Sequence, residues 1–257
     1  MATALDSIIN GVREDLALRK TKPNNFDEKI SHLGAPISPF EYLRKDTISV
    51  ISEIKRSSPS KGELANIADP QELALKYIEG GASAISVLTE ERRFKGSIAD
   101  FVKVREVVKI PMLRKDFIVD EFQIKETRAI GADLQLLIVA ALSKTELSDF
   151  YQMGSELGLA TLFEIHDHAE LEIAMDLSPQ IVGVNSRNLK TLKVDVDNFA
   201  KLIPEIPNTV IKVAESGISN AKEVSDLRTL GADAILVGET LVKAGDPIRT
   251  LRELIGR

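Results

Sequence analysis

Gly81-Ala-Ser-Ala-Ile-Ser-Val87, Gly131-Ala-Asp-Leu-Gln-Leu-Leu137 and Gly231-Ala-Asp-Ala-Ile-Leu-Val237 repeat one pattern at three places in the chain. Each stretch follows a segment with helical spacing and opens a run of apolar residues. Glycine readily takes the left-handed conformation typical of the residue just past a helix. A short apolar run after such a turn is typical of a buried strand. The repeat therefore predicts helix–turn–strand units along the chain.

Eight short segments rich in β-forming residues are spaced along the sequence. They cover residues 48–55, 84–89, 111–115, 134–139, 160–165, 181–185, 210–214 and 234–237. Segments with helical spacing lie between them, as at 70–79, 120–130, 144–157 and 221–230. Alternating strands and helices predict a parallel sheet. An open doubly wound sheet usually has a glycine-rich first turn, which is missing here, so the pattern favours a (β/α)8 TIM barrel.

The first part of the chain predicts a helix outside the barrel. Leu5, Ile8, Ile9, Val12 and Leu16 form the apolar stripe of an amphipathic helix. No linker rich in Pro, Gly or Ser divides the sequence. We expect a single domain over residues 1–257, with an N-terminal helical extension at 1–46 and the barrel at 47–257.

Composition narrows the class of partner. The chain has 33 Lys and Arg against 39 Asp and Glu, so its net charge is −6, and no basic cluster suits a nucleic acid. It has no Cys, which suits a reducing compartment, and no apolar run long enough to span a membrane. The start of the chain lacks the basic and apolar regions of a signal peptide. We expect a cytoplasmic monomer or weak homo-oligomer that binds neither nucleic acid nor membrane.

Polar side chains end five of the predicted strands, where a barrel carries its working groups. They are Glu53 with Lys55, Lys115, Glu164, Asn185 and Glu215. In each strand they alternate with apolar or small residues, as expected for side chains rising from a packed interior to a wet mouth. The competing interpretation is a set of salt bridges along the rim. Because gathering unpaired ions at one small cavity is costly, their convergence predicts a functional site.

The loops after the last two strands predict a phosphate site. Ser216 and Gly217 follow one strand and Gly238 follows the other, beside expected helix starts. Backbone N–H groups at such places bind phosphate, and barrels often hold phosphate there. We therefore expect a small phosphorylated substrate.

Metal and cofactor motifs are missing from the sequence. His166 and His168 lack an acidic third ligand at a fitting distance, so we expect surface residues and no metal. Ser57, Ser58 and Ser60 lack a nearby base and suit hydrogen-bond donors better than nucleophiles. Neither a dinucleotide nor a nucleoside-triphosphate fingerprint occurs. A Schiff base on Lys55 or Lys115 stays open.

Six ordered motifs resemble the indole-3-glycerol-phosphate synthase family over about residues 48–240, and the N-terminal helix resembles that family's extension. The motifs are Glu53-Ile-Lys55-Arg-Ser-Ser58-Pro-Ser-Lys-Gly62, Ser86-Val-Leu-Thr-Glu90 with Phe94-Lys-Gly-Ser97, Leu113-Arg-Lys115-Asp-Phe117-Ile-Val-Asp120, Phe163-Glu164-Ile-His166, Gly183-Val-Asn185-Ser-Arg187-Asn-Leu189 and Glu215-Ser-Gly217-Ile.

The resemblance implies a carbon–carbon lyase of tryptophan biosynthesis that works without a cofactor. The expected reaction closes the ring of 1-(2-carboxyphenylamino)-1-deoxyribulose 5-phosphate and releases carbon dioxide and water. It implies Lys115 as general acid at the keto group and Glu164 as acid and base for the hydroxyl lost as water. Lys55 would contact the carboxylate or act as a second acid, and Glu53 would be a catalytic or orienting carboxylate.

The resemblance also implies which residues hold the substrate. The substrate contacts would be Ser58, Asn185, Arg187, Glu215 and Ser216, the wall around the aromatic ring Pro59, Phe94 and Phe117, and the phosphate contacts Lys55, Ser216, Gly217 and Gly238.

Two positions depart from the family pattern. Glu239 stands where some members have Ser, which removes a side-chain donor to the phosphate, and residues 134–136 read Leu-Gln-Leu, which leaves the role of Leu136 in the ring pocket open.

Efficient acid catalysis by a lysine also requires a pKa well below its unperturbed value of about 10.4. We expect a neighbouring cation or desolvation to lower it toward about 7–8, and Lys55 and Lys115 at one mouth would repel each other in this way.

Two alternatives remain. One is a different sugar-phosphate isomerase or a Schiff-base aldolase. The other is a non-catalytic phosphate-binding barrel.

Overall fold

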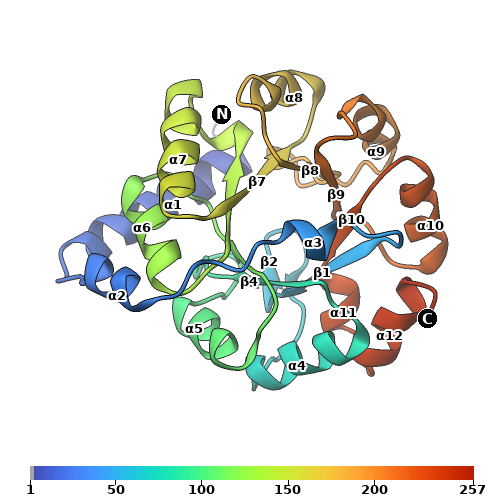
Figure 1. Cartoon of the computed structure of the whole chain (residues 1–257), viewed down its shortest axis with the longest axis horizontal. Coiled ribbons are helices and arrows are strands. Elements are labelled where there is room, and N and C mark those ends of the chain that lie inside the picture. Colours follow the sequence, from blue (N-terminus) through green and yellow to red (C-terminus); the bar gives the residue numbers. More distant parts are fainter. Residues whose placement is uncertain (1–2) are drawn as a thin grey trace.

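The computed structural model describes residues 3–257 and contains a closed barrel of eight parallel strands, which confirms the predicted fold (Figure 1). Around the barrel the strands follow in the order β1, β10, β9, β8, β7, β6, β5 and β4, and β4 closes on β1. Their bounds are β1 Ser49–Ile54, β4 Ala84–Leu88, β5 Met112–Lys115, β6 Leu134–Ile138, β7 Ala160–Ile165, β8 Ile181–Asn185, β9 Ile211–Glu215 and β10 Ala234–Val237. All eight agree with the predicted strands to within two residues.

Helices fill the connections between the strands. They are α4 Pro70–Gly80, α5 Ile98–Val107, α6 Glu121–Ala129, α7 Lys144–Glu156, α8 His168–Met175, α9 Asp197–Leu202, α10 Ala221–Thr229, α11 Glu239–Val242 and α12 Pro247–Leu254. Two 3-10 turns, Val139–Ala141 and Ile203–Glu205, lie among them. None of the helices within residues 3–257 is long and apolar enough to cross a membrane.

The repeated glycines end helices as predicted. Gly81, Gly131 and Gly231 have φ values of 106°, 84° and 100°, in the left-handed region. This conformation turns the chain directly from a helix into the next strand, because glycine has no Cβ to oppose it. The same short turn therefore precedes three of the barrel strands, each of which begins three residues after its glycine.

The barrel strands are buried on both faces. One face packs against the surrounding helices, with Val50, Ile85 and Phe163 in that core. The other faces the barrel interior, with Ile51, Leu113 and Leu162. Both faces being apolar explains why the strands read as near-continuous hydrophobic runs.

The N-terminal extension comprises α1 Ala4–Lys20, α2 Phe26–His32 and α3 Phe40–Leu43. The predicted stripe of α1 is buried, and its Leu5, Ile8 and Val12 belong to the same apolar cluster as the barrel interior. Figure 1 shows α2 beside α6, and α3 near β1. Residues 1 and 2 of the predicted extension lie outside the described residues.

A short hairpin follows β1 and was not predicted. Strands β2 Ser57–Ser58 and β3 Gly62–Glu63 pair antiparallel. The loop of this hairpin includes Pro59 and Ser60, which therefore lie above the carboxyl end of β1. The sequence offered no alternating run long enough to identify such short strands.

Candidate active site

One pocket opens at the carboxyl ends of the barrel strands and brings most of the predicted site residues together. Ten of them line it: Lys55, Ser58, Pro59, Phe94, Lys115, Phe117, Glu164, Asn185, Arg187 and Ser216. They come from six different βα units, so only the closed barrel makes them neighbours. Glu53 and Glu215 do not line this pocket, although both are buried next to it and contact its lysines.

A second pocket adjoins the first and contains all four predicted phosphate contacts, Lys55, Ser216, Gly217 and Gly238. Lys55, Arg187, Ser216 and Glu239 line both pockets. The sequence interpretation did not include two further cations of this pocket, Lys61 and Lys243. Lys61 lies in the unpredicted hairpin and Lys243 just after α11, so neither position showed a recognisable signal.

Lys115 lies at the centre of a buried ionic cluster. Its ammonium Nζ is 2.7 Å from Oε2 of Glu164 and 3.6 Å from Oε2 of Glu215. Asn185 donates a hydrogen bond to the other oxygen of Glu164, at 3.0 Å. At the end of β1, which β4 separates from β5, Lys55 forms an ion pair with Glu53 at 2.5 Å. The alternation of β1 therefore places Glu53 and Lys55 at the mouth, as predicted.

The expected lowering of the Lys115 pKa is wrong for this cluster. Burial of the Lys115 ammonium opposes its charge, but attraction from Glu164, Glu215 and Glu53 outweighs burial and raises its pKa above the usual value. The same attraction holds the pKa of Glu164 below its usual range despite burial. The sequence interpretation considered repulsion between the two lysines. It did not foresee that three carboxylates would surround one of them.

The pKa of Glu215 is shifted in the opposite direction from that of Glu164. Burial and the nearby carboxylates Glu164 and Glu53 together raise its pKa to about 8, although Lys115 partly opposes this. Its Oε1 has no hydrogen-bond partner among the described residues. The raised pKa favours the protonated form of Glu215 at neutral pH, and the lowered pKa of Glu164 favours its ionised form.

Two glycines make room for the inward carboxylates. A Cβ on Gly183 of β8 would overlap Oε1 of Glu215, and a Cβ on Gly238 would overlap Oε1 of Glu53. The φ of Gly238 is −123°, so its backbone conformation does not require a glycine. Gly238 is required for space, whereas Gly217, with a φ of 73°, adopts the left-handed conformation.

The predicted helix starts beside these glycines are only partly present. Gly238 is the N-cap of α11, which has four residues, and Gly217 lies three residues before Asn220, the N-cap of α10. Backbone donors near Gly238 therefore belong to a single helical turn. Glu239 begins that turn and forms ion pairs with Lys61 at 2.7 Å and Lys243 at 2.8 Å.

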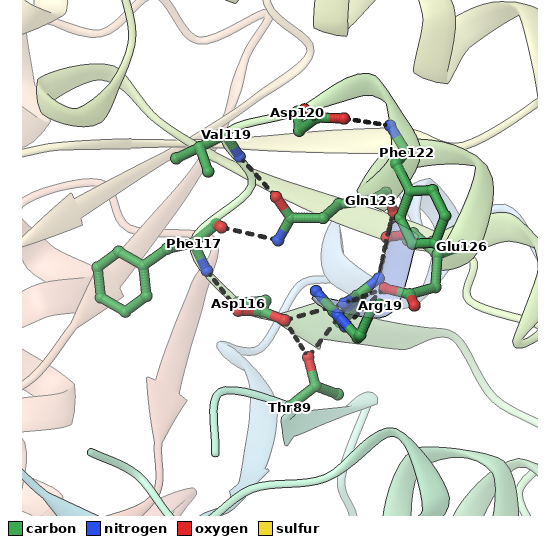
Figure 2. Close-up of polar contacts among 11 residues, drawn as sticks. Arg19, Thr89, Asp116, Phe117, Val119, Asp120, Phe122, Gln123 and Glu126 are labelled. Atoms are coloured by element: carbon green, nitrogen blue, oxygen red, sulfur yellow. Dashed lines mark hydrogen bonds and ion pairs between the residues drawn. The ribbon is translucent and has the colours of Figure 1, made fainter. Parts of the chain in front are cut away.

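The loop that follows Lys115 is fixed by buried polar contacts. Oδ1 of Asp116 accepts the backbone N–H of Phe117 at 2.8 Å, and Nε2 of Gln123 donates to the carbonyl of Phe117 at 2.9 Å. Oε1 of Gln123 also accepts the N–H of Val119, at 2.9 Å. Figure 2 shows these bonds on both sides of Phe117. The ring of Phe117 is thus presented to the pocket from a rigid backbone.

Arg114 connects this loop to the helices around the barrel. Its guanidinium is completely buried and lies 2.9 Å from Asp116 and 2.8 Å from Glu126 of α6. The same Glu126 carboxylate accepts a hydrogen bond from Arg19 of α1 at 3.0 Å. Figure 2 includes Arg19 and Glu126 at the far end of the network from Phe117. The extension is therefore linked through α6 to the strand that carries Lys115.

The apolar part of the pocket matches the predicted ring wall. The rings of Phe94 and Phe117 lie 6.1 Å apart between centroids, and Pro59 lines the same pocket. Leu136, whose role the sequence left open, also lines it. Ile8 of α1 is a further lining residue that was not identified, because the helical pattern showed only that its stripe packs on something.

His166 is not a surface residue, so that expectation is wrong. Its side chain is only 7% exposed, with Nδ1 2.9 Å from Glu170 and Nε2 3.3 Å from Glu164. His168, two residues further on, is 60% exposed, as expected. Within residues 3–257, no cluster of three or more His, Asp or Glu side chains has the arrangement of a metal site.

A family model described as indole-3-glycerol phosphate synthase matches residues 5–254. Among curated proteins, the indole-3-glycerol phosphate synthase of Mycolicibacterium gilvum is 49% identical, over 99% of this chain and 94% of its own. The indole-3-glycerol phosphate synthase of a Nocardioides species is 50% identical, over 99% of this chain and 98% of its own.

Solved structures of low sequence identity share the fold of this chain. A 3-hexulose-6-phosphate synthase from Salmonella typhimurium superposes with a TM-score of 0.63 at 15% identity, over 81% of this chain and 97% of its own. A chain of the tryptophan synthase complex from Pyrococcus furiosus superposes with a TM-score of 0.61 at 17% identity. The match covers 81% of this chain and 98% of that one.

Proposed function

The chain belongs to the indole-3-glycerol phosphate synthase family, and on that premise we propose how its residues carry the reaction. Its activity is the decarboxylating ring closure of 1-(2-carboxyphenylamino)-1-deoxyribulose 5-phosphate, a step of tryptophan biosynthesis. The products are indole-3-glycerol phosphate, carbon dioxide and water. The assignment of roles to individual residues is our proposal.

The two adjoining pockets suit the two ends of this substrate. Lys55, Ser216, Gly217 and Gly238 would hold the phosphate in the second pocket. The aromatic ring would lie between Pro59, Phe94 and Phe117 in the first. Because the protein is acidic overall, cations gathered locally at the mouth are what attract a substrate with two anionic groups.

Lys115 is the general acid of the ring closure. The aromatic carbon that bears the carboxylate attacks the ketone, and the Lys115 ammonium gives a proton to the ketone oxygen, which becomes a hydroxyl group. The observation that carries this role is the place of Lys115, at the mouth and inside a cluster of carboxylates that keeps it protonated. Loss of carbon dioxide then restores the aromatic ring.

Glu164 is the acid and base for the loss of water. Its lowered pKa favours the ionised form, so it can accept the proton that the ring CH2 group beside the nitrogen loses as the C=C bond of the indole forms. It gives a proton to the hydroxyl group, which leaves as water as its C–O bond breaks. Asn185 fixes one carboxylate oxygen of Glu164 by its hydrogen bond, and Arg187 and Ser58 contact the substrate nearby. Glu215, whose raised pKa favours its protonated form, is a substrate contact that donates a hydrogen bond.

Lys55, paired with Glu53, binds an anionic group of the substrate. Lys55 lines both pockets, so it contacts the substrate carboxylate or phosphate, and Glu53 orients it through their ion pair. Every step is a proton transfer or a bond change within the substrate, so the proposal needs neither a cofactor nor a metal. Overall, one proton is taken up for each carboxylate lost as carbon dioxide.

Turnover of the synthetic substrate by the purified protein tests this assignment. The chain contains no Trp, so the fluorescence of the indole product rises over a low background. We expect continuous product formation. Borohydride is the control for a Schiff-base aldolase: a trapped adduct on Lys55 or Lys115 would contradict the proposed acid role. A folded protein that binds phosphate without turnover would favour the non-catalytic alternative.

The cellular setting is a further part of the proposal. We infer that residues 1–257 form one domain that acts in the cytoplasm as a monomer or weak homo-oligomer. The lack of Cys and the packing of α1 on the barrel support this inference. A single cooperative unfolding transition and the mass from sedimentation equilibrium would test it.

A further inference from the structure

His166 touches the catalytic cluster from outside the substrate pocket. It does not line that pocket, yet its Nε2 lies 3.3 Å from Oε1 of Glu164. On the other side of the ring, Nδ1 lies 2.9 Å from Oε2 of Glu170, which also accepts the backbone N–H of His166 at 2.7 Å. The imidazole therefore lies between two carboxylates, hydrogen-bonded to Glu170 and in ionic contact with Glu164.

The charged surroundings of His166 favour its cationic form. Glu164 faces it from its own strand β7, and Glu170 faces it from α8. From α9 comes a neutral contact, the amide of Asn198 bonded to the backbone oxygen of His166. Lys115 of β5 lies on the far side of Glu164. Burial opposes the charge on His166, but the two carboxylates overcome burial and raise its pKa to about 9.

A second cation matters because Lys115 has to give up its proton. When it does, Glu164 loses the ammonium that lies 2.7 Å away. A buried carboxylate without a counter-ion is strongly unfavourable. Glu53 worsens the situation, since its carboxylate also attracts the Lys115 ammonium. Without another cation, the proton of Lys115 would be held too tightly for efficient transfer.

We propose that His166 is a positioning residue that acts as this second cation: held by Glu170, it neutralises Glu164 while Lys115 lacks its proton. In the transfer, an N–H bond of Lys115 breaks and an O–H bond forms on the ketone oxygen, while His166 keeps both of its N–H bonds. The inference rests on the proposed roles of Lys115 and Glu164. Its consequence is that the acid strength of Lys115 depends on the charge state of His166.

The test compares the pH dependence of kcat in the wild type, His166→Gln and the matched control His168→Gln, whose side chain is exposed. Removing one charge beside the acid–base pair should change its pKa by about one unit. At neutral pH we expect His166→Gln to be roughly tenfold slower than the wild type, with KM changed less than about twofold. As the pH rises through about 9, the wild type should slow to the rate of the variant.

This convergence distinguishes an electrostatic role from a structural one, because a distorted site would lower kcat by the same factor at every pH. A ratio that does not change with pH, or rates equal at neutral pH, would overturn the proposal. His168→Gln should follow the wild type throughout. If the wild type and this control do not turn over at all, the proposed function itself fails, and the role of His166 fails with it.

A second variant covers the case in which His166→Gln does not fold. Glu170→Gln leaves the imidazole in place and removes the outer carboxylate, so His166 should lose its proton at lower pH. The slowing of kcat should then begin at least about half a unit below the wild-type pH. A pH profile that superposes on the wild type would contradict the proposal.

Discussion

The ammonium of Lys115 lies 2.7 Å from a carboxylate oxygen of Glu164, so the two groups proposed to move protons share one hydrogen bond. This contact stabilises the charged form of both. It also makes Lys115 a weaker acid than an isolated lysine, which is the opposite of what acid catalysis needs. Substrate binding therefore has to compete for one of the two groups, and the ketone oxygen is the competing partner of Lys115.

The raised pKa of Glu215 predicts a pH-dependent stability. The folded protein retains this proton up to about pH 8, whereas the unfolded chain releases it near the usual carboxyl value of about 4.5. The contribution of Glu215 to the free energy of unfolding is therefore complete below about pH 4.5 and lost as the pH rises through about 8. Urea denaturation should show the wild type weakening relative to Glu215→Gln between pH 5 and 8. Parallel pH dependences in the two proteins would show that Glu215 ionises normally.

Replacing Gly238 tests the space requirement of Glu53. In Gly238→Ala the new methyl group would displace the Glu53 carboxylate and with it Lys55. We expect kcat to fall by roughly tenfold or more, because misplacing groups at a reacting centre by about an ångström has such effects. Gly245→Ala is the matched control, since no atom lies within 4 Å of its Cβ position. A change confined to KM in steady-state kinetics would show that Gly238 acts only on the phosphate.

The buried Arg114 predicts a large loss of stability. Arg114→Met would leave Asp116 and Glu126 buried without their shared cation. Breaking such a pair typically costs about 3–5 kcal/mol in the free energy of unfolding. Arg19→Ala removes only the outer contact to Glu126 and should cost about 1 kcal/mol or less. Urea denaturation of both variants checks the order, and equal losses would show that Arg19 contributes as much as the buried guanidinium.

Glu239 is expected to weaken substrate binding. It places a carboxylate in the proposed phosphate pocket and engages the cations Lys61 and Lys243. In Glu239→Gln these cations are free to meet the phosphate, so KM should fall a few-fold with little change in kcat. Inorganic phosphate should also inhibit the variant at lower concentration. A higher KM would mean that Glu239 holds the two lysines where the phosphate needs them.

Much of the fold was predictable because its signals are local. The turns at Gly81, Gly131 and Gly231 need only a glycine after a helix, and buried parallel strands need only a short apolar run. The extension was harder to interpret beyond α1. Helix α3 has four residues, too few to show a period, and its place depends on contacts with the barrel.

The sequence predicted which residues form the site better than it predicted their charge states. Strand alternation placed Glu53, Lys55 and Glu164 correctly, since side-chain direction follows from the backbone. The charge state of Lys115 depends on which strands become neighbours across the barrel, and no local pattern encodes that distance. The burial of His166 was missed for the same reason, because the packing of α8 supplies Glu170.

Lys115→Met is the variant that tests the proposed mechanism most directly, because methionine keeps the length of the side chain and removes its acidic proton. Single-turnover fluorescence of indole formation should be compared with the wild type, with circular dichroism to verify the fold. We predict intact folding and a loss of about 10²–10⁴-fold in the rate of ring closure. A folded variant whose rate stays within a few-fold of the wild type would contradict the assignment of Lys115 as the acid.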